Sequence, residues 1–495
     1  MTNTTECTSL VPETQMQTLM IEAAEPEILL PVDKCIQCQT MKINGQTVDV
    51  PVEVLIHETA DEVRKILPLV TIEEAGTLLY YKDGVFVRGG EAKVEALLHK
   101  SFHGHEIFDP VHTPKKVIAH LKGLTMASKD KFDADLDIIN MKNGLYNWRK
   151  KTLYKHSPNY LSLIQIPVIY DLAAKCPRIE TVLKRVLSAT DIVKFKEFAG
   201  YCLYRHYPIQ KVFILLGPGQ TGKSYVLDVL RQFVGDENAC SVSLTNLANN
   251  KFAGSDLFGR LLDVVNEMDS GELLSSDLFK QITGGSKDPI RAERKYEHAF
   301  DFINFAKLAF ATNKVPKSRD DTTGFWRRFE ILLCYHVFTA DEYDTETLDH
   351  LTDPEELSGF FNVVIGMLPE LLERRAFTNG MTPEQVKEIW EGNSVPVVDF
   401  ADRFIDAHAA DQVIPKEALH QLFLKYCRLV GTTESEWTIR KFNSELKKTI
   451  PEFKNIRHDT TCRVNGKGCK VWYDTRFKED EFKAFEQEVR KSKKA

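Results

Sequence analysis

The stretch Gly217-Pro218-Gly219-Gln220-Thr221-Gly222-Lys223-Ser224 matches the phosphate-binding loop pattern GxxxxGK(S/T) at every fixed position. Residues 212–216 before it are continuously apolar and predict a buried strand, and residues 225–234 have the period of an amphipathic helix ending at Gly235. Such glycines let backbone N–H groups converge on phosphate oxygens, and the helix N-terminus adds a favourable dipole. In this pattern the lysine reaches the β- and γ-phosphates, and the serine hydroxyl ligates Mg²⁺. Because strand, loop and helix agree, the stretch predicts a nucleoside triphosphate site rather than a chance glycine turn.

The chain as a whole is long enough for several domains. Its 495 residues are 43% hydrophobic and 27% charged, an ordinary globular balance. No apolar run approaches a membrane span and no signal peptide pattern begins the chain, so we expect a soluble, intracellular protein. The net charge of −7 argues against a uniformly basic surface. It does not exclude nucleic-acid binding, which needs only a local basic track.

The ten cysteines lack the spacing of a disulfide framework. Cys35 and Cys38 form a CxxC without a second pair, so a metal there would need further ligands, of which Cys7 and His57 are conceivable. A second loose cluster contains His458, Cys462 and Cys469. We interpret this second cluster as hairpin packing.

Polar residues follow a second apolar run downstream of the loop. Residues 261–265 suit a strand beside the loop, and Asn266-Glu267-Met268-Asp269 follows them. A carboxylate at such a strand end can hold Mg²⁺ through water and polarise the attacking water, so Glu267 is the candidate base and a candidate metal-site residue with Ser224. Asp269 is a candidate assistant, and Asp263, inside the strand, is a weaker candidate.

A third apolar run, 307–312, ends in Asn313. An asparagine after a strand is usually a turn residue, but beside a γ-phosphate its amide can orient the attacking water. Downstream, Arg327 and Arg328 lie within an aromatic bracket, Gly324-Phe325-Trp326-Arg327-Arg328-Phe329, which favours a fixed position over a solvated surface pair. An arginine projected into a neighbouring subunit's site stabilises charge on the γ-phosphate. The candidate catalytic residues are Lys223, Glu267, Asn313, Arg327 and Arg328.

These elements lie within about 110 residues, a compact spacing that resembles superfamily III helicases. More narrowly, the chain resembles the phage/plasmid primase-helicase family that large DNA viruses share, including poxvirus-type NTPase relatives. The matching text lies within about 130–340 and comprises Asn143-Gly144-Leu145, Lys155-His156-Ser157-Pro158, Lys175-Cys176-Pro177, Glu197-Phe198-Ala199-Gly200-Tyr201, Lys280-Gln281-Ile282-Thr283-Gly284-Gly285 and Thr312-Asn313-Lys314-Val315-Pro316. One departure is Asn266, where many relatives of the wider superfamily carry an acid, so Glu267 would carry most of the chemistry.

The resemblance implies an α/β fold with an AAA+-like P-loop NTPase core, assembled as a ring, with a hexamer expected and ATP at subunit interfaces. It implies a cytoplasmic protein of a bacterial or archaeal cell, or of a virus-infected host. It also implies a DNA-contacting hairpin, here over 290–300. Cations at its tip could hold phosphates and an aromatic side chain could stack on a base, whereas an ordinary exposed hairpin would use the same charges for solubility. We expect DNA contact from Arg294, Lys295, Tyr296 and His298.

Positive charge also concentrates near the C-terminus. From Trp437 to Lys478 there are eleven lysines and arginines and four acids. A helix at 438–446 followed by strands near 455–458 and 468–473 has the order of a winged helix, on whose recognition helix Arg440, Lys441, Lys447 and Lys448 lie. Many winged helices bind proteins instead, but we interpret this one as DNA-binding through Arg440 and Lys441.

The predicted organisation has seven segments. They are a mobile tail (1–34), an accessory α/β region (35–130), a helicase-associated domain (131–210), the P-loop core (211–340), a helical extension (341–393), a winged helix (394–478) that starts in a linker at 393–396, and a charged tail (479–495). Within them we expect an Asp-Gly hairpin over 77–87, strands around Asn143-Gly144 and Lys150-Lys151, helical structure over 177–207 and helical periodicity over 398–430.

Three functions remain open from the sequence: a ring helicase on single-stranded or forked DNA, an ATP-switched initiator or loader, and a non-catalytic DNA-binding scaffold. A primase or other replication proteins are conceivable partners, no membrane is expected, and RNA is not excluded as a substrate. Asp133, Asp135 and Asp137 superficially resemble a polymerase metal cluster. We interpret them as a turn and strand start, and we predict a helicase without primase activity.

Overall fold

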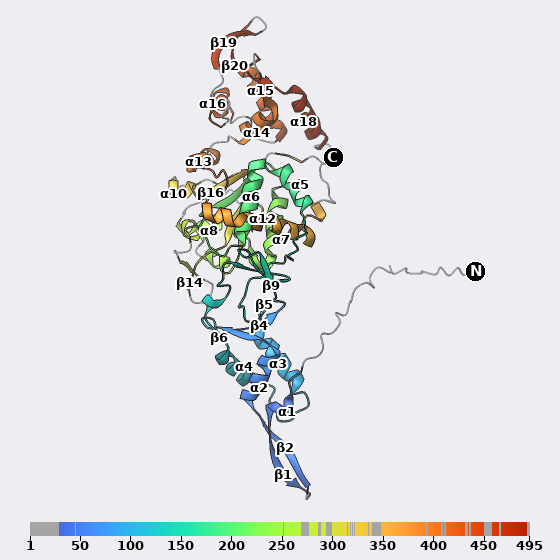
Figure 1. Ribbon diagram of the computed structural model, residues 1–495. Coiled ribbons are helices and arrows are strands. Elements are labelled where there is room, and N and C mark those ends of the chain that lie inside the picture. Colours follow the sequence, from blue (N-terminus) through green and yellow to red (C-terminus); the bar gives the residue numbers. More distant parts are fainter. Residues whose placement is uncertain are drawn as a thin grey trace, which may run out of the picture. The chain divides into compact units, whose positions relative to one another are not determined.

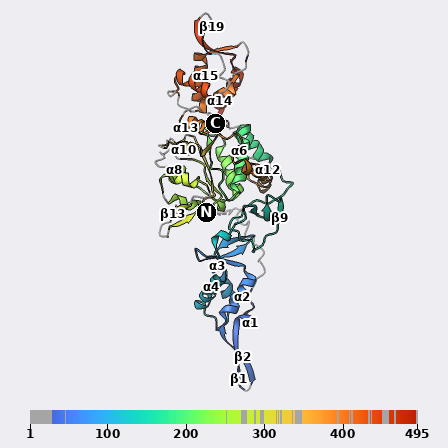
Figure 2. The same ribbon diagram turned by 60° about the vertical axis from the view of Figure 1, so that its left-hand side comes forward.

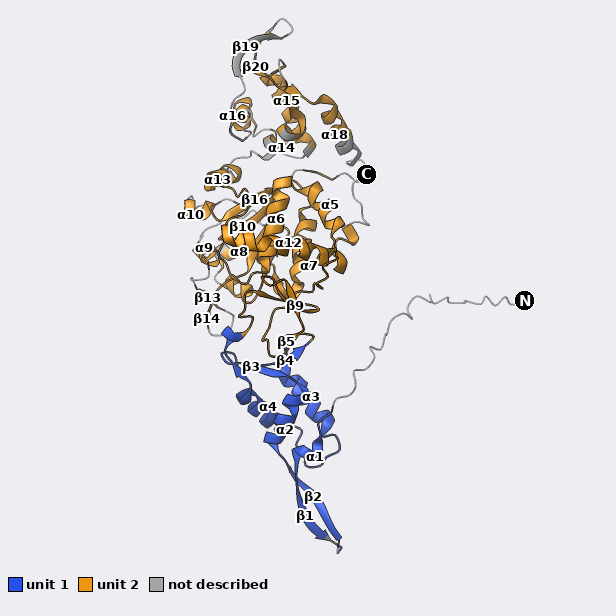
Figure 3. Ribbon diagram, in the orientation of Figure 1, with its two compact units in different colours: residues 1–82, 86–131 blue, residues 83–85, 132–495 orange. Residues whose placement is uncertain are grey.

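The computed structural model divides into two compact units, residues 1–82 with 86–131 and residues 83–85 with 132–495 (Figure 3). The first division falls beside the predicted boundary at residue 130. The structure describes residues 29–44, 46–250, 252–268, 277–285, 289–293, 299–313, 315–316, 318, 320, 322–334, 336–338, 348–391, 395–406, 409, 412–430, 434, 437–449, 458–464 and 467–492.

Unit 1 contains a four-stranded sheet in the order β5-β4-β3-β6 and a separate hairpin, β1-β2. Its main elements are α1 (Val32–Cys35), β1 (Ile36–Ile43), β2 (Gln46–Val54), α2 (Ile56–Ile66), β3 (Leu69–Ile72), β4 (Thr77–Lys82), β5 (Val85–Arg88), α3 (Gly90–Ser101), α4 (His112–Leu124) and β6 (Met126–Ala127). Apolar side chains from α2, α3 and α4 form its core. Leu30 is buried in that core, so the folded region begins before the predicted boundary at residue 35, and the rest of the predicted tail (1–28) lies outside the described residues.

The Asp-Gly hairpin predicted over 77–87 is confirmed. Strands β4 and β5 are neighbours in the sheet, and the two residues between them, Asp83 and Gly84, have φ of 49° and 92°. Both values lie in the left-handed region, which Asp and Gly tolerate and which the tightest hairpin turns require.

Unit 2 opens with a three-stranded antiparallel sheet followed by two helices. The sheet contains β7 (Ile138–Met141), β8 (Gly144–Asn147) and β9 (Thr152–Tyr154), and the helices are α5 (Pro177–Val186) and α6 (Ala189–Cys202). The predicted strands are therefore confirmed. The helical stretch predicted over 177–207 is interrupted once and ends at Cys202. The interruption lies at Ser188, whose hydroxyl accepts the N–H of Asp191 (3.1 Å) and caps α6.

The acidic cluster before β7 serves the fold, as the turn interpretation predicts. Asp133 has φ of 49°, and its carboxylate accepts hydrogen bonds from Ser162 Oγ (2.6 Å) and Leu163 N (2.8 Å). Burial raises the pKa of Asp133, although Arg205 opposes the shift. Within the described ranges, no group of three or more His, Cys, Asp or Glu side chains could hold a metal ion, and this cluster is no exception.

A five-stranded parallel sheet forms the centre of unit 2, in the order β11-β12-β15-β10-β16. Its strands are β10 (Val212–Leu216), β11 (Ala239–Cys240), β12 (Leu262–Val265), β15 (Lys307–Thr312) and β16 (Phe329–Leu333). The strands predicted at 212–216 and 307–312 have these bounds, and the run 261–265 is a strand from its second residue. The expected α/β architecture is thus confirmed as a mixed α/β fold with a parallel sheet.

Both faces of the parallel sheet are covered by helices (Figures 1 and 2). On β10, Phe213 and Leu215 face a core shared with α5, α6, α7 (Lys223–Val234) and α12 (Pro354–Arg374). The alternating residues Val212, Ile214 and Leu216 face a second core with α8 (Leu244–Asn249), α9 (Asp277–Ile282), α10 (Thr323–Trp326) and α13 (Pro383–Glu391). Burial on both faces explains why the parallel strands are continuously apolar.

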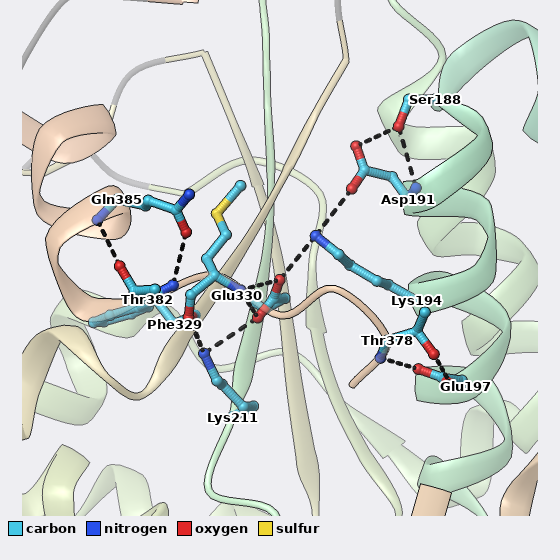
Figure 4. A network of polar contacts seen from close by, with 11 residues as sticks. Ser188, Asp191, Lys194, Glu197, Lys211, Phe329, Glu330, Thr378, Thr382 and Gln385 are labelled. Carbon is cyan, nitrogen blue, oxygen red and sulfur yellow. Dashed lines mark hydrogen bonds and ion pairs between the residues drawn. The ribbon is translucent and has the colours of Figure 1, made fainter. Parts of the chain in front are cut away.

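A buried ion network fixes β16 in the sheet (Figure 4). The carboxylate of Glu330, fully buried, lies 3.0 Å from Nζ of Lys194 on α6 and 3.2 Å from Nζ of Lys211, and it accepts the N–H of Met381 at 3.1 Å. Lys194 also pairs with Asp191 (3.3 Å). Separating the partners of a buried ion pair leaves uncompensated charges, which destabilises the fold. The network therefore holds β16, α6 and the chain before α13 together.

The C-terminal part of unit 2 has its own aromatic core. Its elements are α14 (Val395–Phe404), β17 (Ile405–Asp406), β18 (Val413–Pro415), α15 (Lys416–Val430), α16 (Ile439–Thr449), β19 (His458–Val464), β20 (Lys467–Tyr473), β21 (Arg476–Phe477) and α18 (Glu479–Ser492). The helix predicted at 438–446 is confirmed as α16, and the strand predicted at 468–473 is confirmed as β20. The strand predicted at 455–458 overlaps β19 only at His458, and residues 455–457 lie outside the described residues.

Three predictions in this region are wrong. The linker at 393–396 ends earlier, because α14 begins at Val395 with Pro396 in its first turn, where proline is tolerated. The helical periodicity over 398–430 is interrupted by β17 and β18. Residues 479–492 are not a tail but helix α18, which buries Phe482 and Phe485 in the aromatic core. Among the helices that the structure describes, none is long and apolar enough to cross a membrane.

Candidate nucleotide site

The predicted phosphate loop connects β10 to α7, and two of its three glycines, Gly217 and Gly222, are required by the packing. A Cβ at Gly217 would lie 1.9 Å from the carbonyl oxygen of Cys334. Gly222 has φ of 77°, and its Cβ would lie 2.7 Å from Val186 and 2.9 Å from Phe338. Gln220 also has a positive φ, 63°, so the loop bends in a left-handed conformation twice before α7 begins at Lys223. The strand, loop and helix predicted from the sequence are confirmed.

Lys223 is held inside the loop and contacts a second strand. Its Nζ donates to the carbonyl oxygens of Gly217 (2.8 Å) and Pro218 (2.6 Å), to Thr221 Oγ1 (3.1 Å) and to Asn313 Oδ1 (3.0 Å). The side chain is buried, and burial lowers the pKa of Lys223. Ser224, the next residue of α7, is exposed. The structure therefore brings Lys223 and Asn313 together, although 90 positions separate them in the sequence.

Glu267 lies at the same edge of the sheet as Lys223 and Asn313, since β10, β15 and β12 are parallel neighbours whose carboxyl ends meet there. The segment after β12 is anchored by the N–H of Met268, which donates to Ala311 O on β15 (2.9 Å). Glu267 itself is exposed.

Two acids near Glu267 differ from it in their surroundings. Asp263 is fully buried within β12, where its Oδ1 accepts the N–H of Val242 (2.7 Å). Burial raises the pKa of Asp263 to about 7. Its position inside the strand, away from the strand tip, is that of a structural residue. Asp269 lies outside the described residues. Asn266 donates to Asp228 Oδ1 on α7 (3.1 Å).

The two arginines lie at the other end of the sheet from the loop. Phe329 pairs with Val212, and Leu333 pairs with Leu216, so β16 starts where β10 starts. Arg327 and Arg328 precede β16, and five strand residues, roughly 17 Å, separate that end from the loop. Neither arginine can reach the phosphate loop of its own chain.

Arg327 and Arg328 have different environments. Arg327 is exposed and donates from Nη2 to Gln210 Oε1 (2.6 Å). Arg328 is buried, donates from Nε to Thr283 Oγ1 (2.8 Å) and also bonds the carbonyl oxygen of Gly324. Burial, and then the neighbouring Arg327, lower the pKa of Arg328 to about 10. Arg327 is therefore available to a partner, whereas Arg328 is engaged within its own chain.

The predicted DNA-contacting hairpin is present at its base. Strands β13 (Ile290–Ala292) and β14 (Phe300–Phe302) pair antiparallel, with Ile290 opposite Phe302. Ile290, Ala292 and Phe302 are buried, so the base of the hairpin is anchored in the second core. The four predicted tip residues, Arg294, Lys295, Tyr296 and His298, lie outside the described residues.

A basic hollow of about 590 Å³ lies between α16 and β20 in the C-terminal part. Its cationic lining residues are Lys416, Arg440, Lys447 and Lys470, with Glu417 as the acidic one. Lys441 lies next to the hollow on α16, with Nζ 4.6 Å from the centre of the Trp437 ring. For Lys448 the structure describes only the helical backbone. Sequence reasoning missed Lys416, which precedes the basic stretch, and did not single out Lys470 within it.

The cysteine pairs do not gather further ligands in the part of the chain that the structure describes. Cys35 is buried in the core of unit 1, and Cys38 is exposed on β1. His57 contacts the ring of His120 at 4.6 Å, while Cys7 lies outside the described residues. Cys462 and Cys469 are partners in the strand register of the β19-β20 hairpin, as the hairpin interpretation predicts.

Comparison with known proteins gives two family matches. Residues 215–328 match the model described as "Family of unknown function (DUF5906)", and residues 113–188 match the model described as "D5 N terminal like". A search of the curated proteins finds no match.

Among solved structures, the chain is similar to the apo structure of the NrS-1 C terminal region, with 13% identity, 83% of this chain and 96% of that chain covered, and a TM-score of 0.46. The A form apo structure of the same region has 13% identity, covers 83% and 97% and has a TM-score of 0.44. The resemblance to the phage/plasmid primase-helicase family is confirmed by the two family matches: the chain carries a D5 N-terminal-like region at 113–188 and a DUF5906 region at 215–328.

Proposed function

We propose that this chain is an ATP-dependent DNA helicase of viral, phage or plasmid replication, with an AAA+-like P-loop core that works as a ring. One observation carries the proposal: Lys223 of the loop and Asn313 of the next strand meet at 3.0 Å, at the sheet edge where Glu267 also lies. A phosphate cradle, a water-orienting amide and a carboxylate base are the parts that phosphoanhydride hydrolysis needs.

The residues of the loop fit ATP and Mg²⁺. Gly217 to Gly222 form a bend that only glycine permits at two positions, and α7, twelve residues long, starts directly after it. Backbone N–H groups at such a helix start bind phosphate oxygens. Lys223 would hold the β- and γ-phosphates, and exposed Ser224 with Glu267 would hold Mg²⁺. Bound ATP with its metal would supply the scissile bond and neutralise charge on the phosphates.

The residues of the site also have roles in the hydrolysis itself. Glu267 accepts a proton from the attacking water, and the Asn313 amide orients that water. Lys223 exchanges its bonds to the loop carbonyls for bonds to phosphate oxygens. Because Arg327 lies roughly 17 Å from its own loop, it acts on the site of a neighbouring subunit. This requirement favours a closed ring, for which a hexamer is the expected size.

Nucleic acid would be held at two places. The tip residues 294–298 of the β13-β14 hairpin would grip one strand without sequence preference. The C-terminal part, proposed as a winged helix, would bind phosphates in its basic hollow through the lining residues Arg440, Lys447, Lys416 and Lys470, with Lys441 beside the hollow. Primase chemistry is not part of the proposal, because Asp133 and its neighbours are used in a turn.

An ATP hydrolysis assay combined with strand displacement on forked duplexes tests the proposal. We expect hydrolysis that single-stranded DNA stimulates, and strand release from a fork of one polarity. Glu267→Gln should lower kcat by about 100-fold or more while ATP binding persists. Glu237→Gln, an exposed acid at a distance from the site, is the matched control.

The alternatives give different results in the same assay. An ATP-switched initiator or loader would hydrolyse ATP and release no strand from either fork. A scaffold would bind DNA with no hydrolysis at all, which would refute the proposal. Forks with an RNA strand test which nucleic acid the ring follows.

A further inference from the structure

Gln210 bridges two parts of the proposed machinery. Its Oε1 accepts a hydrogen bond from Arg327 Nη2 (2.6 Å), and its Nε2 donates to the carbonyl oxygen of Gly284. A primary amide is suited to this position, because it accepts at one end and donates at the other. The bond takes up one of the five N–H donors of the Arg327 guanidinium.

The backbone around Gln210 is held rigidly by two buried tyrosines. The hydroxyl of Tyr201 both accepts the N–H of Ile209 (3.0 Å) and donates to its carbonyl oxygen (3.1 Å). The hydroxyl of Tyr207 donates to the carbonyl oxygen of Lys211 (2.9 Å). Both tyrosines are at most 1% exposed. The residues on either side of Gln210 are thus fixed, and its side chain projects from a firm support.

Arg327 has little other restraint among the described contacts. It follows the four-residue helix α10, and its N–H donates to Thr323 O (3.0 Å), while its side chain is exposed. Arginine is a long, flexible side chain that loses rotamer entropy when it is ordered. A bond to a side chain on a rigid support lowers the number of orientations that Arg327 can adopt before a neighbouring subunit arrives.

The other partner of Gln210 belongs to the segment 277–285, which contains α9 and leads along the chain to β13. Gly285 has φ of 107°, and a Cβ there would lie 3.2 Å from Gln210 Nε2, so the segment approaches Gln210 closely. Arg328 contacts the same segment, since its Nε donates to Thr283 Oγ1 (2.8 Å). Lys280 of α9 pairs with Asp320 (2.5 Å), in the chain before α10. The segment that leads to the hairpin therefore contacts the arginine pair at several points.

We infer that Gln210 is a positioning residue for Arg327 and that its bond to Gly284 couples this arginine to the hairpin segment. The inference rests on the proposed function, because it assumes that Arg327 completes a neighbouring ATP site. A strand held by the hairpin would shift the segment 277–285, and Gln210 would transmit the shift to Arg327. Hydrolysis at one interface would then respond to nucleic acid held by the adjacent subunit.

Two substitutions separate the two halves of the inference. Gln210→Leu removes both bonds, so kcat should fall roughly 10- to 100-fold with KM for ATP changed less than about twofold. Gln210→Glu keeps the acceptor for Arg327 but turns a carboxylate oxygen toward Gly284 O. The measured quantity is the ratio of kcat with a single-stranded oligonucleotide to kcat without one, which should fall to about 1 in this variant. Gln421→Leu, an exposed glutamine on α15, is the matched control.

A double-mutant cycle shows whether Gln210 acts through Arg327. Arg327→Ala and the double variant Arg327→Ala/Gln210→Leu should have the same kcat, because the second change then has nothing left to position. In addition, Lys223→Ala subunits should restore hydrolysis to Gln210→Leu subunits in mixed rings, which a defect in the Gln210→Leu subunit's own ATP site would not permit.

Additive losses in the cycle, or a Gln210→Leu variant with wild-type kcat, overturn the positioning role. A Gln210→Glu variant that keeps its DNA stimulation, or a wild type that DNA does not stimulate, overturns the coupling to the hairpin. A wild type that hydrolyses no ATP refutes the proposed function itself, and this result is distinguishable from the others.

Discussion

At the scale of single residues, Asp263 is an example of a buried structural carboxylate, in contrast to the candidate base Glu267. Burial raises the pKa of Asp263 to about 7, although Val242 N–H favours the charged form. The pKa of Asp263 is higher in the folded state than in the unfolded state. Its contribution to the free energy of unfolding is therefore fully present below about pH 4 and is lost as the pH rises through about 7. Asparagine keeps an acceptor for Val242 N–H and cannot ionise. When the pH is raised from 5.5 to 8, we therefore expect the free energy of unfolding of Asp263→Asn to increase relative to that of the wild type, by on the order of 2 kcal/mol.

Urea unfolding at the two pH values, followed by a probe in the parallel-sheet core, measures this difference. The variant should retain ATP hydrolysis, whereas Glu267→Gln should lose it. A stability difference between Asp263→Asn and wild type that is the same at both pH values would contradict the shifted pKa. Loss of hydrolysis in a folded Asp263→Asn protein would return Asp263 to the list of candidate bases.

The sequence pattern predicted those residues whose role depends only on their neighbours along the chain. Gly217 and Gly222 are required by the close approaches that the loop pattern implies, and Asn313 ends the strand whose bounds the apolar run defines. The pattern could not distinguish Arg327 from Arg328, because their difference comes from Thr283 and Gln210, which lie far away in sequence. Partners contributed by distant segments leave no periodic signal in a single sequence.

At the scale of elements, secondary structure was predicted wrongly where only a few apolar residues stand among charged ones. Helix α18 reads as a charged tail, but Phe482 and Phe485, three residues apart, lie on one face and are buried. A linker was predicted at 393–396 because Pro396 suggests a break in the helix. Proline is tolerated in the first turn, however, and helix α14 begins at Val395. The long parallel strands gave no such difficulty, since burial on both faces makes their apolar runs continuous.

Helix α18 should therefore be needed for the stability of the C-terminal part. Phe485→Ala removes a ring that contacts Phe404 at 5.4 Å and Tyr426 at 5.8 Å, so we expect a loss of about 3 kcal/mol or more in the unfolding of this region. Lys483→Ala, on the exposed face of the same helix, should stay within about 0.5 kcal/mol of the wild type. Denaturant unfolding followed by near-ultraviolet circular dichroism measures both. If a chain ending at Lys478 unfolds like the wild type, α18 is an appendage and not part of the core.

At the scale of the whole molecule, the position of the arginines decides how subunits cooperate. Because Arg327 lies at the end of the sheet opposite to its own loop, Lys223→Ala and Arg327→Ala damage different sides of one interface. Equal mixing should give intact interfaces at about a quarter of positions in a ring with random order, so hydrolysis should recover to about that fraction of the wild-type rate. Arg328→Ala should not be rescued, because it leaves Thr283 and Gly324 without their buried partner and destabilises its own chain. Sedimentation must show that both parents assemble. If the Lys223→Ala and Arg327→Ala mixture then stays inactive, Arg327 does not act across the interface, and the ring model loses its main structural support.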